Sequence, residues 1–152
     1  MIEDHWVGHE LPPERFVVEA GRLKLFANVI GETRKEYRCA EEAKVQGYRD
    51  IPALPTFLFA AEMESGNLFK LLGQMGVPVT SILHGEQRFD YYDTACAGDV
   101  LIVKSKVTDL ATKKGGHMQL MHMQTHIARE NGQPIQDNTS VIVVRHTHGT
   151  DQ

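Results

Sequence analysis

Two carboxylates, Glu62 and Glu64, interrupt the most apolar stretch of the chain, residues 56–74. A carboxylate on a buried helix needs a hydrogen-bonding or charged partner, since burial otherwise raises its pKa. A raised pKa suits a carboxyl group to exchange protons near neutral pH. The preceding Ala60 and Ala61 would leave room for a substrate to approach. One of the two glutamates could act as a base or a nucleophile; the alternative is that they lie along a polar seam of the helix.

Three histidines, His117, His122 and His126, lie on one predicted strand. Imidazoles can bind a divalent metal ion. However, side chains four positions apart on a strand are too distant to share one ion, because each residue rises roughly 3.3 Å. We therefore predict a polar outer sheet face and no metal site. The chain also has no glycine-rich phosphate loop, no serine nucleophile elbow and no CxxC pair.

The composition describes one soluble globular domain, residues 1–152, with 41% hydrophobic and 24% charged residues. A formal net charge of −4, with no basic run longer than Lys113-Lys114, argues against a surface for nucleic acids or anionic membranes. The acidic N-terminus is unlike a signal peptide, and no apolar run reaches the roughly 20 residues of a membrane span. Cys39 and Cys96 form no spacing motif, so we expect a cytoplasmic protein with reduced thiols.

Helical periodicity dominates the first half of the chain. Leu23, Phe26, Ala27 and Ile30 share one face, and Gly31 is suited to end that helix. Helices are expected over residues 20–30, 40–46 and 56–74.

The last of these helices is expected to be the longest. Because residues 56–74 are apolar around much of the helix, other structure must wrap around them. Gly66-Asn67 should weaken or kink its middle. Residues 50–55 contain two prolines and are expected to approach the helix in an extended conformation.

The second half of the chain alternates with the period of two that is typical of strands. Leu101, Val103, Ser105 and Val107 share one face of a predicted strand. Strands are expected over residues 80–93, 100–112, 117–129 and 136–145, with hairpin turns between them at Gly98-Asp99, Gly115-Gly116 and Asn131-Gly132. We therefore predict an α+β fold in which a meander of antiparallel strands wraps around one hydrophobic helix. That arrangement is typical of the hotdog fold.

Several segments carry motifs in the order found in one family. They are Gly31-Glu32-Thr33-Arg34-Lys35-Glu36-Tyr37 followed by Ala43, Asp50-Ile51-Pro52-Ala53-Leu54-Pro55-Thr56-Phe57, Ile82-Leu83-His84-Gly85-Glu86-Gln87-Arg88-Phe89, and Ala97-Gly98-Asp99-Val100-Leu101. Together they resemble the MaoC-like (R)-specific enoyl-thioester hydratases and dehydratases, and best the N-terminal, FAS1-like dehydratase branch. The resemblance covers about residues 10–145 and implies the same hotdog fold.

In catalytic members of that family, an Asp and a His hold and activate the water that adds to an enoyl thioester. The resemblance places Glu32 and Tyr37 at these two positions. Glu32 is one methylene longer than Asp and would misplace the water by on the order of 1 Å, which is enough to cost about a hundredfold in rate. Tyr37 is a poor base because the reference pKa of tyrosine is roughly 10.

The resemblance therefore implies a substrate-binding half that lacks the usual Asp/His pair. The catalytic half would be another hotdog polypeptide. The alternatives are a homo-oligomer with an altered catalytic set, a thioesterase of the same fold that uses Glu62 or Glu64, and an acyl-CoA binder without activity.

The resemblance also implies the residues of the site. The candidate catalytic residues are Glu32, Tyr37 and His84. The candidate substrate-binding residues are Pro55, Thr56, Phe57, Gly85 and Gln87. Each could instead have a structural role. No metal and no resident cofactor are expected, because CoA or the phosphopantetheine of an acyl-carrier protein arrives with the acyl thioester. A homodimer or higher homo-oligomer is expected, since joining two sheets covers their exposed edges.

Overall fold

The computed structural model describes residues 1–146, so the last six residues of the predicted domain lie outside the described part. Five antiparallel strands form one sheet in the order β1-β3-β4-β5-β2. The strands are β1 Glu14–Val17, β2 Ile82–Tyr91, β3 Val100–Lys113, β4 Met118–Arg129 and β5 Pro134–Arg145. The helices are α1 Ala20–Val29, α2 Ala40–Val45, α3 Phe59–Met63 and α4 Asn67–Gln74. The α+β prediction is confirmed.

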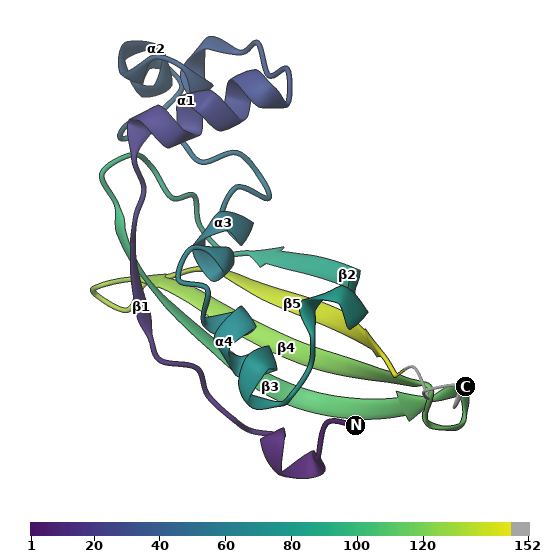
Figure 1. Ribbon diagram of the computed structural model, residues 1–152. Coiled ribbons are helices and arrows are strands. Elements are labelled where there is room, and N and C mark those ends of the chain that lie inside the picture. The colour runs from purple at the N-terminus through teal and green to yellow at the C-terminus, as the bar shows by residue number, and fades with distance from the viewer. Residues whose placement is uncertain (147–152) are drawn as a thin grey trace.

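The helices form two groups relative to the sheet (Figure 1). Helices α3 and α4 lie over one face, while α1 and α2 form a small layer beyond one end. Short 3-10 turns connect the larger elements at Asp4–Trp6, Lys35–Tyr37, Val79–Ser81 and Lys114–Gly116. The second of these turns and α2 carry the chain from α1 towards α3.

The four predicted strands are present, but their expected order as a simple meander is wrong. β2 pairs with β5 instead of with β3, which follows it in the chain. The short strand β1 was not predicted; it pairs with the beginning of β3, Glu14 opposite Val103. The free edges of the sheet are consequently β1 and β2.

The predicted long helix over residues 56–74 is also wrong, because the chain forms α3 and α4 in its place. Gly66 adopts a left-handed conformation with φ of +67°, which ends the regular hydrogen bonding of the first segment. The hydroxyl of Ser65 then accepts a hydrogen bond of 3.0 Å from the amide of Asn67, the first residue of α4. The break lies at the position where the sequence predicted a weak point.

Two apolar clusters make up the core under this broken helix. One cluster lies towards α1 and α3, and its fully buried members include Val18, Leu23, Leu101 and Ile127. The other lies under α4 and includes Leu72, Val107, Met121 and Val144. The sheet therefore has one buried face, as the alternation in β3 predicted, but that face is not apolar along its whole length.

The opposite face of the sheet is polar. On β4, His122 and His126 alternate with buried residues and point outward as predicted, and His126 pairs with Asp137 at 2.6 Å. Within residues 1–146, no three His, Cys, Asp or Glu side chains are grouped so that they could hold a metal ion. The helices of the same residues are too short or too polar to span a bilayer.

Candidate functional site

Glu32 lies in the turn that follows α1, and its carboxylate is fully engaged. Gly31 ends the helix with φ of +74°, as predicted. The Glu32 carboxylate then accepts hydrogen bonds from the Arg34 guanidinium at 2.7 and 3.1 Å, and from the Thr33 and Arg34 amides, both at 2.9 Å. The Arg34 side chain, helped by these amides, lowers the pKa of Glu32 to about 2. Such a carboxylate does not take up a proton near neutral pH.

Tyr37 belongs to the same closed unit. Its ring is buried against Ala27 and Leu54, and the Arg34 guanidinium lies 4.7 Å from the ring centre. Burial raises the pKa of the Tyr37 hydroxyl above its usual value. The structure thus joins two of the three candidate catalytic residues through Arg34 and gives neither the properties of a base.

The three candidate substrate-binding residues just before α3, Pro55, Thr56 and Phe57, do not all line one cavity. Pro55 lines a cavity of about 350 Å³ that also contains all four tyrosines of the chain. Thr56 has φ of +72°, a strained conformation for a β-branched residue, and its amide donates to the Tyr91 hydroxyl at 3.1 Å. Phe57 is 4% exposed and packs edge-on against Phe26, so it is a core residue.

His84, the third candidate catalytic residue, belongs to a different site. It lies on the edge strand β2 opposite Ile142, and its ring stacks on Phe59 of α3 with 5.5 Å between ring centres. Its Nε2 atom is 3.1 Å from the Oε1 atom of Gln87. The pairing register shifts between His84 and Glu86, and this β-bulge sets the direction of the imidazole.

Gly85 occupies the bulge, and no larger residue fits there. An added Cβ would lie 2.8 Å from Cγ2 of Val143 and 3.1 Å from the carbonyl oxygen of Val141. We expect Gly85→Ala to lower the free energy of unfolding by about 1–3 kcal/mol, measured by urea denaturation. Gly73→Ala in α4 is the control, since its Cβ would meet nothing within 4 Å. It should stabilise by about 0.5–1 kcal/mol, and an equal loss in both variants would contradict the packing explanation.

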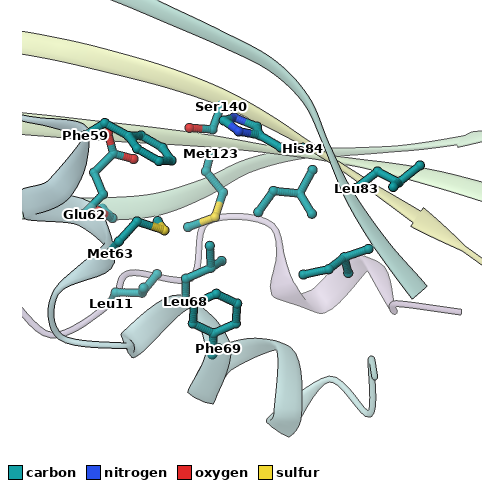
Figure 2. Close-up of a pocket in the computed structure, with 13 residues that line it drawn as sticks. Leu11, Phe59, Glu62, Met63, Leu68, Phe69, Leu83, His84, Met123 and Ser140 are labelled. Atoms are coloured by element: carbon teal, nitrogen blue, oxygen red, sulfur yellow. The ribbon is translucent and has the colours of Figure 1, made fainter. Parts of the chain in front are cut away.

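A pocket of about 140 Å³ opens at the break between α3 and α4. Most of its lining is apolar. In Figure 2, Glu62 and His84 lie at one end of this pocket together with Phe59 and Ser140, while Leu68 and Phe69 lie at the other. We call this cavity the α3/α4 pocket. Its lining comes from both helices, from strands β2 to β5 and from the N-terminal segment, and comprises Leu11, Phe59, Glu62, Met63, Leu68, Phe69, Ile82, Leu83, His84, Ser105, Met123, Ser140 and Ile142.

A row of polar side chains crosses the inner face of the sheet beneath this pocket. We define this polar belt as Ser105, Thr125, Gln136, Asn138 and Ser140. Strand register brings its members together: Ser105 lies opposite Thr125, and Thr125 lies opposite Asn138. The Ser105 and Thr125 hydroxyls are 2.8 Å apart, and Gln136 donates to Asn138 at 2.6 Å. The belt separates the two apolar clusters of the core.

The carboxyl group of Glu62 is hydrogen-bonded to the polar belt. The Asn138 side-chain amide donates a hydrogen bond to its Oε1 atom, and Asn138 itself is completely buried. Burial raises the pKa of Glu62, while hydrogen bonds from Asn138 and Thr125 and the charge of His84 oppose part of that rise. By contrast, Glu64 is exposed and pairs with Arg22 at 2.7 Å. The structure therefore places one of the two glutamates in a pocket and the other at the surface.

Most of the chain matches one known family of protein domains. The family described as "FAS1-like, dehydratase domain region" matches residues 5–138. The chain belongs to this family. A UPF0336 protein of Thermobifida fusca is 29% identical to this chain over 133 residues, which cover 88% of this chain and 86% of the relative.

Solved structures with the same fold include several dehydratases. The HadBC (3R-hydroxyacyl-ACP dehydratase) complex of Mycobacterium tuberculosis contains a chain with 16% identity and a TM-score of 0.78, matched over 94% of this chain and 99% of that one. A MaoC-like dehydratase has 18% identity and a TM-score of 0.81 over 93% of this chain, which corresponds to 43% of that protein. At these identities the likeness concerns the fold, and the predicted hotdog fold is confirmed.

For this FAS1-like chain, the sequence pointed to Glu62, His84 and Gln87 but missed the polar belt. Thr125 on β4, and Asn138 and Ser140 on β5, stand beside other polar residues in the sequence, so no local motif marks them as buried. One signal was available, because side chains alternate between the two faces of a strand. Ser105 shares a face with Leu101, Val103 and Val107, and a polar residue at such a position predicts a buried hydrogen-bonding group.

Proposed function

We propose that this chain is the substrate-binding half of an enoyl-thioester hydratase or dehydratase, whose Asp/His pair is supplied by a separate hotdog subunit. The observation that carries the proposal is the closed unit of Glu32, Arg34 and Tyr37. With a pKa near 2 and both oxygens engaged by Arg34, Glu32 is not able to activate water as a base. The segment supports the architecture of the site and supplies no acid or base of its own.

The α3/α4 pocket supports an acyl chain as the bound group. Its walls are chiefly apolar, from Phe59, Met63 and Leu68 on the helices to Met123 and Ile142 on the sheet. Methionine side chains adapt to ligands of different shape. The chain requires no cofactor of its own, since the CoA or phosphopantetheine group enters with the substrate. The proposal includes the cytoplasmic location expected from the sequence.

The exposed edge of the sheet supports a partner subunit or a second copy. β2 is an edge strand, with Leu83 51% exposed and Tyr91 50% exposed. An unpaired edge with apolar side chains favours pairing with another sheet. Among the similar structures, HadBC is a complex, and the MaoC-like dehydratase chain is more than twice as long as the matched part. Both arrangements are consistent with a site completed by a second hotdog half.

The test is the hydration of crotonyl-CoA and longer enoyl-CoA substrates by the purified chain, alone and with a hotdog subunit that has an intact Asp…His motif and is encoded by a neighbouring gene. We expect no turnover by the chain alone, and a rate at least on the order of 10²-fold higher in the complex. Glu32→Gln should leave the rate of the complex unchanged. Robust turnover by the chain alone, abolished by Glu32→Gln, would favour the homo-oligomer with an altered catalytic set and refute the proposal.

A thioesterase is the second candidate, and the position of Glu62 is the observation that favours it. A buried carboxyl group with a raised pKa beside an apolar pocket is suited to act as a base. Acyl-CoA hydrolysis that is abolished by Glu62→Gln but not by Glu64→Gln would support this function. Tight acyl-CoA binding without hydration or hydrolysis, in any pairing, would instead identify the chain as a binder.

A further inference from the structure

One row of side chains on the outer face of the sheet is apolar, although most of that face is polar. Strand register defines the row: Ala111 lies opposite Leu120, Leu120 opposite Val143, and Val143 opposite Leu83. Along their strands these residues alternate with members of the apolar cluster under α4, so they point to the outer face. Leu83 is 51% exposed and the other three are partly exposed. We call these four residues the outer apolar row.

The outer apolar row lies near the end of the sheet that is farthest from α1 and α2 (Figure 1). Helices α3 and α4 lie over the opposite face, so no helix of residues 1–146 covers the row. Two rows further along the same four strands, the outer positions are all polar: Lys106, Gln124, Thr139 and Arg88. Apolar side chains that gather at one place on a polar surface mark an interaction site.

Opposite charges flank the outer apolar row on its two sides. Towards the turn between β3 and β4, the next outer positions carry Lys113 on β3 and Arg145 on β5. On the other side they carry Asp109 on β3 and Glu86 on β2. All four side chains belong to exposed residues, and no ion pair within residues 1–146 involves them. By contrast, charges farther along the same face pair with one another.

This charge pattern fits a second copy of the chain. Two sheets pack face to face about 10 Å apart, with their strands within about 30° of each other. In a two-fold symmetric contact, if one residue meets another, the second also meets the first across the interface. With the axis along the outer apolar row, each row residue meets its own counterpart, and Lys113 of each copy meets Asp109 of the other. Arg145 then lies one strand spacing, about 4.8 Å, from the line of Glu86.

An axis along the strands gives the opposite result. It would place β3 of one copy over β2 of the other, so that Asp109 would face Glu86. Like charges that meet across an interface are unfavourable and suppress the arrangement that brings them together. The charges beside the row therefore favour one orientation of the second copy over the other.

We propose that the outer apolar row and the charged positions on its two sides form an interface with a second copy of this chain, related by a two-fold axis along the row. The contact lies on the outer face, whereas the partner in the proposed function adds to the β2 edge. Both contacts can therefore exist together and join edge-paired sheets into a larger assembly. The inference does not depend on the proposed function, because it requires no ligand and no catalytic partner.

Charge exchange between Asp109 and Lys113 tests the orientation. Asp109→Lys and Lys113→Asp should each weaken the association about tenfold, because each places like charges against each other twice across the axis. The double variant should restore it. The two residues are four positions apart on one strand, roughly 13 Å, so a contact within one chain does not explain the rescue. Lys106→Asp, farther along the same face of β3, is the control and should have no effect.

Sedimentation equilibrium of the intact chain over a range of concentrations measures these dissociation constants. A double variant that associates as weakly as the single ones would overturn the orientation and with it the proposal. A wild-type chain with the same mass as the single variants at every concentration would do so as well.

Cross-linking tests the contact by a second route. In a Cys39→Ser background, which removes the partly exposed thiol, Leu120→Cys should form a covalent dimer with a short bismaleimide, since Leu120 meets its own counterpart at the axis. Gln124→Cys is the control: it lies four residues along β4, roughly 13 Å from the axis, so its counterpart is about 26 Å away. Equal cross-linking of the two variants, or none at Leu120→Cys, would refute the interface whatever the outcome of the hydration assay.

Discussion

Asp99→Ala is expected to lower the free energy of unfolding by about 3 kcal/mol, the largest effect among single charge removals in this chain. Asp99 is 7% exposed and forms ion pairs with Arg49 and Arg129, the latter at 3.3 Å. It also accepts the Cys96 amide at 2.9 Å. Removing the carboxylate leaves the mostly buried Arg129 with only one carboxylate partner, Asp93. It also removes the side-chain hydrogen bond to the Cys96 amide in the loop between β2 and β3.

Urea denaturation measures this loss, with Asp90→Ala as the matched control. Asp90 pairs with Arg88 at 2.8 Å, but both side chains are exposed, so its removal should change stability by less than about 1 kcal/mol. Similar losses in the two variants would show that burial of the Asp99 pairs contributes nothing.

The effect of Asp99 should also depend on pH. Burial by itself raises the pKa of Asp99, but the Arg49 hydrogen bond, the Cys96 amide and the two guanidinium charges together hold that pKa below its usual value. The folded state therefore binds the proton less readily than the unfolded state, whose Asp pKa is about 3.9. The stability difference between the wild type and Asp99→Asn should be full above pH 5 and shrink as the pH falls below about 4. A difference that grows towards acid pH would contradict this.

Local features of the fold could be predicted from the sequence, and long-range ones could not. The helix ended by Gly31 and the buried face of Leu101, Val103 and Val107 follow from periodicity and from the backbone preferences of glycine, which depend on neighbouring residues alone. The pairing of β2 with β5 depends on how the 92–99 loop leads the chain away from β2, and no periodic pattern records that. β1 was missed because only four residues pair, directly after Pro12-Pro13.

The site shows the same division between local and long-range features. The substitutions at Glu32 and Tyr37 were visible in the motif, but the role of Arg34 was not, because its guanidinium contacts both residues only after the turn folds. Similarly, Glu62 and Glu64 were equivalent candidates from the sequence. The break at Gly66 and the position of Asn138, 76 residues away from Glu62 in the chain, distinguish them.

Asn138→Ala is expected to destabilise the protein by about 3 kcal/mol, although it removes no charge and only a small volume. Asn138 is fully buried and connects two partners: it accepts from Gln136 at 2.6 Å and donates to Glu62. The substitution removes the acceptor of the Gln136 side-chain amide and one of the two side-chain hydrogen bonds that Glu62 accepts inside the core. Urea denaturation measures the loss. Thr139→Ala is the control, since the neighbouring half-buried Thr139 lies on the other face of β5 and its substitution should change stability by no more than about 0.5 kcal/mol.

A double-mutant cycle with Glu62→Leu tests whether this loss arises from the unpaired carboxyl group. In the wild type, Glu62→Leu should destabilise, because the Asn138 side-chain amide loses its acceptor. In the Asn138→Ala background it should stabilise, because it removes a buried carboxyl group that no longer receives the Asn138 hydrogen bond. The same loss in both backgrounds would show that the two side chains act independently. The predicted reversal would mean that the belt and Glu62 form one unit, in which each member is tolerated in the core only because the other is present.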